Sequence, residues 1–350
     1  MIKVVYFNQW FSSITDVIKD IKKKHGDKIR VIASSKNESH AYKDVVDKFV
    51  VEDWVEDENE AISEANYLAW LTNFFTENKV DIFFAKKHSD WIAKHKYEFS
   101  LQRVFVVTED IKTQMALESK VAVYDDLSKL SSIKDYIPEY FLGDRENVKR
   151  LLKNYSKASK SWCFKLAKDE GGFSFRRIDR HKLTMDSLHG YRVNCVSVSE
   201  TKDLLEKSSD EQLKQLLFME YLDNPEISVD CYNSKQGFIA ICREKESGTR
   251  NQKLYYNRTI SKLCEELGKH YELRFPFNVQ FRYDKDKNLK LLEINPRMSG
   301  GTYYQTLFGM NLADVCLCDL LNDEKDYNID DFIDFETKKV SHVEKAIKVE

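Results

Sequence analysis

The sequence has few glycines and prolines, 11 and 4 among 350 residues, which excludes collagen-like and Gly/Pro-rich low-complexity chains. It also lacks the positive excess of nucleic-acid-binding proteins, since the net charge is −3 and the two signs are interleaved along the chain. No apolar run approaches the roughly 20 residues that cross a bilayer, so no membrane partner is expected. With 42% hydrophobic residues, the chain is predicted to be globular, with a core divided between two or three subdomains.

Metal-binding and disulfide patterns are also missing. The seven cysteines are odd in number and scattered, without a C-x-x-C pair, and the eight histidines contain no His-x-x-x-His. Buried reduced thiols are therefore expected, and a dedicated zinc site is not. Cys316 and Cys318 lie two apart in a predicted helix, which is a poor geometry for chelation. The start, MIKVVYFNQW, lacks the basic and apolar regions of a signal peptide, so a cytoplasmic location is expected.

The first 110 residues alternate strand-like and helix-like runs. IKVVYF, KIRVIASS and VDIFFAK have the composition of strands, and the amphipathic run EAISEANYLAWLTNFFTENK is typical of a long helix. Strands separated by helices predict a parallel, doubly wound sheet. Because no G-x-G-x-x-G follows the first strand, we expect a Rossmann-like scaffold without the dinucleotide fingerprint.

The pattern changes after this region. Residues 110–130 are predicted to form one helix, with a chain exit at Pro138. Strand-like runs such as EISVDCY, GFIAIC, NVQFRY and LKLLEI then follow one another with hairpin-type turns, and one helix interrupts them near residues 258–273. These features predict an antiparallel sheet in an α+β domain. The tail after Asn311 is predicted to begin with a helix.

The most informative stretch is LLEINPRMSGG at residues 291–301. If the preceding turn is centred near Asp286, Gln280 lies close to Glu293, and Glu293 shares a strand face with Asn295. Carboxylate and amide oxygens suit Mg²⁺, which usually takes its other ligands from water and phosphates. The alternative is a polar, solvent-facing side of an edge hairpin.

An anion site could follow directly. Pro296 fixes the backbone where the strand ends and aims Arg297, whose guanidinium binds phosphate in a bidentate manner. The turn Ser299-Gly300-Gly301 offers backbone N–H groups to an anion. The alternative is a plain glycine turn before a helix.

Two further patches carry suitable groups. Lys165 interrupts the apolar strand CFKLA, and a buried lysine favours an anionic partner. Gly171 and Gly172 follow it in a polar loop that could close over phosphates or could be a hairpin turn. In LLFMEYLDNPEISVD, Glu220 and Glu226 flank an extended segment that could hold adenine and ribose, or could be exposed acids beside a turn.

Taken together and in this order, the three patches resemble the ATP-grasp superfamily, in its carbamoyl-phosphate-synthetase-like branch of carboxylate–amine ligases. The resemblance covers roughly residues 110–320, and its specific part is NVQF…LLEINPRMSGG. It implies ATP and Mg²⁺, with Mn²⁺ as a possible substitute. It assigns the metal to Gln280, Glu293 and Asn295, and catalysis to Arg297 and Lys165. The implied ATP ligands are Lys120, Lys165, Gly171, Gly172, Glu220, Tyr221, Leu222, Glu226 and Arg243.

The resemblance also implies an architecture. We expect a Rossmann-like pre-ATP-grasp domain at residues 1–110 and an ATP-grasp domain at 111–322, whose two α+β subdomains sandwich ATP. The small lid subdomain is expected at about 155–220, and residues 323–350 form a C-terminal extension. The sequence departs from the family where an Asp-Lys or Asp-Arg pair is usual. Ser119-Lys120 is the best candidate here, with Lys112 as its rival.

The expected activity is carboxylate–amine ligation through an acyl phosphate, with release of ADP and phosphate. The substrates would be a small-molecule or peptide carboxylate and an amine, with a homodimer as a possible assembly. Arg176, Arg177 and Arg250 are candidates for carboxylate binding or ordinary surface residues. The alternatives are a bicarbonate-phosphorylating carboxylase or carbamoyl-phosphate-type enzyme, and a non-catalytic ATP-binding regulator.

Overall fold

A computed structural model describes residues 2–8, 10–153, 155, 160–167, 173–179, 194–246, 248–323 and 327–341. The chain forms two compact units. Unit 1 comprises Met1–Met115, Ile227–Val279 and Ile294–Glu350, and unit 2 comprises Ala116–Glu226 and Gln280–Glu293. Because this division follows compactness, the domain boundaries predicted after residues 110 and 322 stay a prediction.

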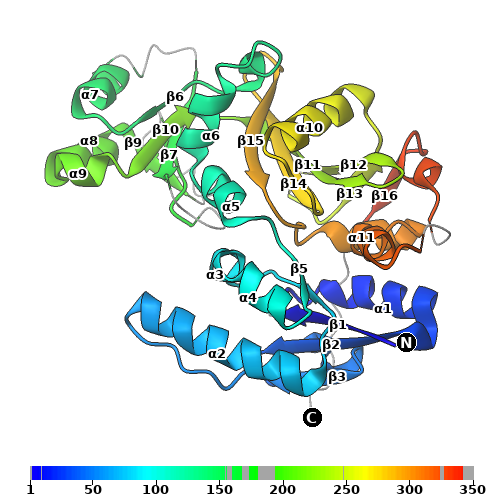
Figure 1. Cartoon of the computed structure of the whole chain (residues 1–350). Coiled ribbons are helices and arrows are strands. Elements are labelled where there is room, and N and C mark those ends of the chain that lie inside the picture. Colours follow the sequence, from blue (N-terminus) through cyan, green and yellow to red (C-terminus); the bar gives the residue numbers. More distant parts are fainter. Residues whose placement is uncertain are drawn as a thin grey trace. The chain divides into compact units, whose positions relative to one another are not determined.

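The first sheet belongs to unit 1 and is parallel, with strand order β3-β2-β1-β4-β5. Its strands are β1 (Lys3–Asn8), β2 (Ile29–Ser35), β3 (Lys48–Val51), β4 (Ile82–Phe84) and β5 (Phe105–Val107). Its helices are α1 (Ile14–His25), α2 (Glu60–Asn78), α3 (Ser89–Lys94) and α4 (Lys96–Leu101), with η1 (Gly26–Lys28) and η2 (Ala41–Asp44) as short turns. The predicted doubly wound parallel sheet is confirmed (Figure 1).

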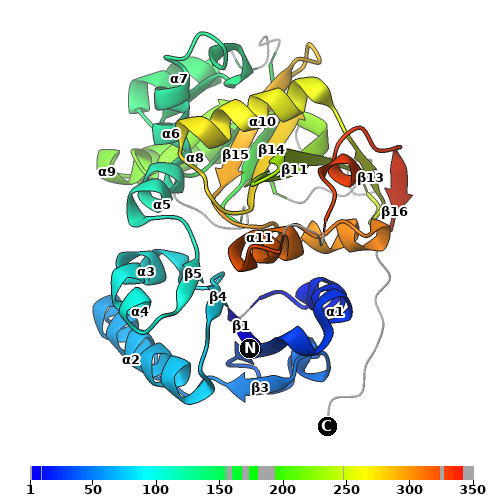
Figure 2. The ribbon, with the colours of Figure 1, turned by 45° about the vertical axis from the view of Figure 1, so that its right-hand side comes forward.

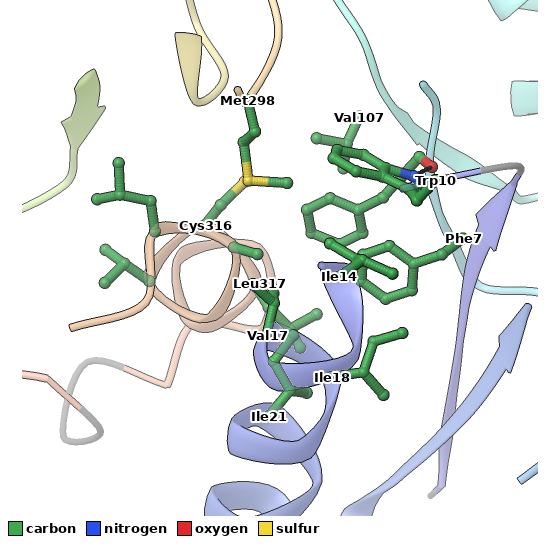
Figure 3. Close-up of a cluster of buried hydrophobic side chains, with 14 of the residues drawn as sticks. Phe7, Trp10, Ile14, Val17, Ile18, Ile21, Val107, Met298, Cys316 and Leu317 are labelled. Carbon is green, nitrogen blue, oxygen red and sulfur yellow. Dashed lines mark hydrogen bonds between the residues drawn. The ribbon is translucent and has the colours of Figure 1, made fainter. Parts of the chain in front are cut away.

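Alternation along the strands gives this sheet two buried faces. Val5 and Phe7 of β1 pack in one cluster with α1, whereas Val4 and Tyr6 pack in another with α2. A parallel sheet covered on both faces needs such continuous apolar strands. The α1 cluster also includes Leu317 and Met298, so residues far along the chain complete the core of the N-terminal sheet (Figure 3).

The second sheet belongs to unit 2 and has the order β6-β10-β7-β8-β9. Its strands are β6 (Tyr140–Leu142), β7 (Trp162–Leu166), β8 (Arg176–Asp179), β9 (Cys195–Ser197) and β10 (Leu216–Glu220). β10 is antiparallel to β6 and β7, and β7 is antiparallel to β8. The helices of this unit are α6 (Lys120–Leu127), η3 (Lys134–Tyr136), α7 (Arg145–Lys153), α8 (Val198–Lys207) and α9 (Asp210–Leu213). Helix α5 (Ile111–Glu118) is divided between the units, with its residues up to Met115 in unit 1.

The third sheet has the order β15-β14-β11-β12-β13-β16. Its strands are β11 (Asp223–Ser234), β12 (Gly237–Lys245), β13 (Gln252–Tyr255), β14 (Phe277–Tyr283), β15 (Leu289–Asn295) and β16 (Lys338–Val340). The residues of β11, β14 and β15 are divided between the two units. The helical elements near it in sequence are α10 (Arg258–His270), η6 (Thr302–Phe308), α11 (Leu312–Leu321) and η7 (Ile329–Phe332). Of these, α10 and α11 are labelled in Figure 2.

The structure corrects one predicted helix and adds strands that were not predicted. The single helix expected over residues 110–130 is two helices, because Ser119 has extended backbone and caps α6 by accepting a hydrogen bond from the N–H of Ala122. β13 and β16 were not predicted, since neither four nor three residues give a clear strand pattern. Among the described residues, no helix is both long enough and apolar enough to span a membrane.

Candidate functional site

The hairpin of β14 and β15 has the turn that the sequence predicts. The N–H of Asp284 donates to the carbonyl of Asn288 at 2.9 Å, and the Asp284 carboxylate accepts the N–H groups of Asp286 and Asn288, each at 2.9 Å. An aspartate that binds the backbone ahead of it in this way stabilises a turn. The turn near Asp286, on which the predicted pairing of Gln280 with Glu293 depends, is therefore present.

The burial pattern of β15 is irregular near the predicted metal ligands. Leu291 and Ile294 are both buried although they lie three residues apart, so the two-residue alternation is interrupted between them. Glu293 and Asn295 flank Ile294, are partly exposed, and lie on one strand face. Gln280 is also partly exposed. These positions are compatible with the predicted metal set, which stays a prediction.

Lys120 lies at the first turn of α6 and contacts the proposed metal ligand Glu293. Its Nζ is 2.6 Å from Oε2 of Glu293 and 2.8 Å from the carbonyl oxygen of Leu292. Lys112, the rival candidate, is exposed on α5. The geometry therefore favours Lys120, whose cation would also lie near phosphates bridged by a metal on Glu293.

Tyr124 holds the same part of β15. Its hydroxyl is buried and donates to the carbonyl oxygens of Leu292 at 2.8 Å and Leu291 at 3.3 Å. Burial raises the pKa of Tyr124 well above its usual value, so the hydroxyl stays protonated as a donor. Sequence reasoning did not identify Tyr124, because a tyrosine on the apolar side of a helix predicts core packing and gives no sign of a hydrogen-bond partner.

Lys165 is 8% exposed in the middle of β7, opposite Leu217 of β10, as its apolar surroundings predict. The loop that follows carries Gly171 and Gly172, which lie outside the described residues. Beyond it, the hydroxyl of Ser174 accepts the N–H of Leu166 at 2.9 Å. The predicted lid therefore begins at a strand with a buried cation.

The acidic residues near the end of β10 are engaged with the protein. Glu220 is 3% exposed and accepts the N–H of Glu139 at 2.9 Å, with Nζ of Lys160 3.2 Å from its other oxygen. Leu222 is buried, and the Tyr221 N–H donates to the carbonyl of Ser161 at 2.7 Å. Glu220 thus fixes the segment 220–222 that is predicted to hold adenine.

Two arginines contact the residues predicted to bind adenine and ribose. The guanidinium of Arg177 stacks over the ring of Tyr221, 4.1 Å from its centre. Arg282 on β14 donates to Glu226 at 2.7 Å and 3.2 Å. The predicted ribose ligand Glu226 therefore has a cationic partner, which sequence reasoning did not identify because the pair joins two strands 56 residues apart.

In unit 1, the turn after Arg297 is fixed from two sides. Arg297 is partly buried at the end of β15, where its Nη1 lies 3.4 Å from the Met298 carbonyl. Ser13 Oγ donates to the carbonyl of Gly300 at 2.9 Å, and a Cβ on Gly300 would lie 3.2 Å from the Phe11 ring. The loop between β1 and α1 therefore supports one side of the predicted anion site.

Arg243 supports the other side. It is 1% exposed and binds both oxygens of Asp230, with Nε at 2.6 Å and Nη2 at 3.3 Å. Its Nη2 also donates to Ser299 Oγ at 2.6 Å, and a Cβ on Gly301 would lie 2.3 Å from its Nη1. Gly301 is thus required by the close approach of a buried guanidinium. These contacts favour a positioning role for Arg243, while its predicted contact with ATP stays a prediction.

Asp230 is the centre of this network. Besides Arg243, its carboxylate accepts hydrogen bonds from Ser299 at 2.8 Å, Gln305 at 2.6 Å and Asn278 at 2.9 Å. A buried charge pair is stable only when its remaining hydrogen-bonding capacity is used, as it is here. The network links β11, β12 and β14 to the turn at 299–301.

Comparisons with known proteins agree with the predicted resemblance to the ATP-grasp superfamily. Residues 212–343 match a protein family described as ATP-grasp in the biosynthetic pathway with Ter operon. A search of curated proteins found no match. Among solved structures, N5-carboxyaminoimidazole synthetase from Staphylococcus aureus, complexed with ADP, has a TM-score of 0.61 at 12% identity, over 91% of this chain and 76% of that one.

Two biotin carboxylase structures are also similar. The biotin carboxylase domain of 2-oxoglutarate carboxylase from Hydrogenobacter thermophilus, in complex with MgADP and bicarbonate, has a TM-score of 0.64 at 14% identity, over 97% of this chain and 74% of that one. Biotin carboxylase from Campylobacter jejuni has a TM-score of 0.64 at 12% identity, over 91% and 71%.

These matches agree with the prediction of an ATP-grasp enzyme that uses ATP and Mg²⁺, and they confirm the predicted fold. The chain has the ATP-grasp fold, and its residues 212–343 match an ATP-grasp family.

Proposed function

We propose that this chain is an ATP- and Mg²⁺-dependent carboxylate–amine ligase that forms an acyl phosphate and releases ADP and phosphate. The observation that carries the proposal is the contact between Lys120 and Glu293 beside Asn295. A carboxylate, an amide and a cation at one strand end suit the oxygen ligands and charges of a metal–phosphate group.

Each group has a role that follows from its chemistry. Gln280, Glu293 and Asn295 would hold Mg²⁺, which neutralises charge on the phosphates when bound. Lys120 and Lys165 would bind phosphate oxygens, and Arg297 with the N–H groups of residues 299–301 would bind the acyl phosphate. Phosphoryl transfer asks a protein mainly for positioning and charge neutralisation, which these groups provide.

The proposed adenine and ribose ligands lie in unit 2. Glu220 orders the segment containing Tyr221 and Leu222, whose backbone would read the adenine edge, and Glu226 would bind ribose hydroxyls. The lid with Gly171 and Gly172 would exclude water, which otherwise hydrolyses an acyl phosphate. Arg176, Arg177 and Arg250 remain candidates for binding the substrate carboxylate.

The test is release of ADP and phosphate from Mg·ATP with pools of carboxylic acids and amines, followed by mass spectrometry of products. Turnover that needs one carboxylate and one amine, with a product lighter by one water than their sum, supports a ligase. Bicarbonate as the sole carboxylate requirement supports the carboxylase alternative, which the bicarbonate-bound H. thermophilus neighbour favours. Tight Mg-dependent ATP binding without turnover in any pool would favour a regulatory protein.

Replacing Glu293 with alanine tests the site itself. We expect Glu293→Ala to abolish ATP turnover while the chain stays folded, because the variant lacks a metal ligand and the partner of Lys120. Asp286→Ala removes an exposed carboxylate from the same hairpin and should keep full turnover. Near-wild-type ADP formation by folded Glu293→Ala, judged by circular dichroism, would refute the assignment.

We also propose a homodimer in the cytoplasm. The H. thermophilus neighbour is described as a dimer. Here Tyr97, Leu101 and Phe105 are 71%, 68% and 47% exposed on α4 and the edge strand β5. The cytoplasmic location is supported by the seven cysteines, all of which are free thiols, as is usual for proteins of a reducing compartment. Light scattering of the purified chain tests the dimer, and a monomer at all concentrations would refute it.

A further inference from the structure

The end of α1 and one face of α11 bring three metal-binding side chains together within unit 1. His25 Nε2 lies 2.6 Å from Oδ1 of Asp314 and 3.9 Å from Sγ of Cys318. The three donor atoms all lie within 4.8 Å of one another, and the residues are 4%, 0% and 0% exposed. Among the described residues, this is the one such group of three or more histidine, cysteine or acidic side chains.

Helix geometry explains the cluster. Asp314 and Cys318 are four residues apart on α11, so their side chains lie on the same helix face one turn apart. His25 is the last residue of α1, which packs beside α11 through Val17 and Leu317 (Figure 3). The sequence gives no sign of this group, because 289 residues separate His25 from Asp314.

The distances are close to those of a tetrahedral metal site. Ligand atoms about 2.0–2.3 Å from a Zn²⁺ ion lie about 3.3–3.6 Å from one another. The distance between His25 Nε2 and Cys318 Sγ, 3.9 Å, is a few tenths of an ångström wider than this. The distance between His25 Nε2 and Asp314 Oδ1, 2.6 Å, is narrower by about 0.7 Å or more, because a hydrogen bond joins the two atoms. Small side-chain rotations would therefore admit the ion.

The surroundings supply supporting contacts and charge balance. Nζ of Lys24 binds Oδ2 of Asp314 at 2.9 Å, leaving Oδ1 directed at His25, and Asp20 binds the same ammonium at 3.0 Å. Hydrogen bonds of this kind to ligating carboxylates orient metal ligands. When Cys318 is a thiolate, Asp20, Asp314 and Cys318 carry three negative charges. The ammonium of Lys24 and a divalent cation together carry three positive charges and balance them. Nδ1 of His25 has no hydrogen-bond partner among the described residues, so the polar contacts of the ring are those with Asp314 and Cys318.

We propose that His25, Asp314 and Cys318 form a structural Zn²⁺ site that clamps α1 to α11. The ligands are a neutral imidazole, a carboxylate and a thiolate, and water fills the fourth position. Binding releases the thiol proton of Cys318 to solvent, moves the ring proton of His25 from Nε2 to Nδ1 so that Nε2 can bind the ion, and needs no electron transfer. This site is independent of the proposed ATP-binding residues, and its role is to hold the N-terminal sheet to the C-terminal helix.

The test uses the full-length chain, stripped of metal with a chelator and titrated with Co²⁺ and then Zn²⁺. Cobalt bound by Cys318 gives a sulfur-to-metal charge-transfer band, which cobalt at the cysteine-free set Gln280, Glu293 and Asn295 cannot give. We expect one Co²⁺ per chain with this band, displacement by Zn²⁺, and a rise in melting temperature with Zn²⁺.

Matched variants identify the ligands. Cys318→Ser should lose the band, whereas Cys316→Ser, which changes another buried thiol on α11, should keep it. Cys318→Ala serves if the serine variant does not fold. Lys24→Met should weaken Zn²⁺ binding by about 10–100-fold, as expected for a residue that orients a ligand.

Two outcomes overturn the proposal. One is a folded wild-type chain that takes up no Co²⁺ or Zn²⁺ at micromolar concentrations, which would leave His25 and Asp314 as a hydrogen-bonded core pair. The other is a charge-transfer band that survives in folded Cys318→Ala, which would place the metal on another thiol.

Discussion

A methyl group on Gly301 would lie 2.3 Å from Nη1 of Arg243, closer than any real contact allows. We expect Gly301→Ala to lower the free energy of unfolding by about 1–3 kcal/mol, because the guanidinium is buried and held by Asp230. Gly300→Ala is the matched control. Its methyl would meet the ring of Phe11 at 3.2 Å, and that ring is 53% exposed and able to turn away. Urea unfolding of both variants checks this, and equal losses would contradict it.

Glu109 makes stability depend on pH. It is fully buried, and burial raises its pKa to about 7, although the N–H groups of Phe275 and Arg274 bind its Oε1 at 2.8 Å each. The folded chain therefore binds a proton between the unfolded pKa of about 4.5 and pH 7 that the unfolded chain has released. Because the proton favours the folded state, the contribution of Glu109 to stability falls as pH rises through this window, by up to about 3 kcal/mol.

Glu109→Gln should remove this dependence. The amide oxygen can still accept both N–H groups, and the side chain no longer ionises. Urea unfolding at pH 5 and pH 8 should show a smaller loss of stability for the variant than for the wild type. Lys96 and Arg274 favour the charged form of Glu109 and are present in both proteins. An identical pH profile for the two chains would refute the assignment.

At the scale of elements, α6 holds β15 in place through Tyr124. Tyr124→Phe removes a donor to the Leu291 carbonyl and one of the two side-chain donors to the Leu292 carbonyl, which Lys120 also binds. We therefore expect a loss of about 1 kcal/mol in the free energy of unfolding. Mg·ATP should also bind more weakly, since Glu293 is the next residue along the strand. Tyr140→Phe, whose hydroxyl contacts the exposed Asp125, should change stability by less than about 0.5 kcal/mol. Urea unfolding and ATP titration measure both effects, and equal results for the two variants would contradict this role.

The elements also show what the sequence can predict. β1, α2 and the hairpin of β14 and β15 were predicted because period, apolar content and turn residues agree within each of them. The helix break at Ser119 was missed because a lone serine is compatible with a continuous helix as well as with a helix cap. Pairs such as Arg243 with Asp230 and Arg282 with Glu226 could not be predicted, since they depend on which strands become neighbours.

The candidate site also has residues that the sequence could predict and contacts that only the structure shows. Local spacing placed Glu293 and Asn295 on one strand face, and family resemblance suggested Lys120 as an ATP ligand. The structure adds a contact between Lys120 and Glu293, which favours Lys120 over Lys112. The roles of all the candidate site residues stay predictions: Lys120, Lys165, Glu220, Tyr221, Leu222, Glu226, Arg243, Gln280, Glu293, Asn295 and Arg297. Gly171 and Gly172 lie outside the described residues.

At the scale of the molecule, the N-terminal sheet shares a core with later parts of unit 1. Val5, Phe7 and Ile14 cluster with Ile241, Leu254 and Leu312 (Figure 3 shows part of this cluster). We therefore expect that residues 111–350 made alone do not fold, because the apolar surface that α1 and β1 cover would be exposed. Circular dichroism and gel filtration of this fragment test the prediction, with the full-length chain as the control. A monomeric fragment with a cooperative melt would contradict it.

The three segments of unit 1 have a consequence during synthesis. A ribosome adds about 5–20 residues per second, so roughly 15–60 s pass between the emergence of α1 and that of α11. Throughout this interval Val17 and Ile21 have no helix to pack against, although unit 2 can already close once Glu293 has emerged. Val17 and Ile21 of the nascent chain therefore stay uncovered by α11 for this time, and synonymous codons that slow translation before residue 312 would lengthen it.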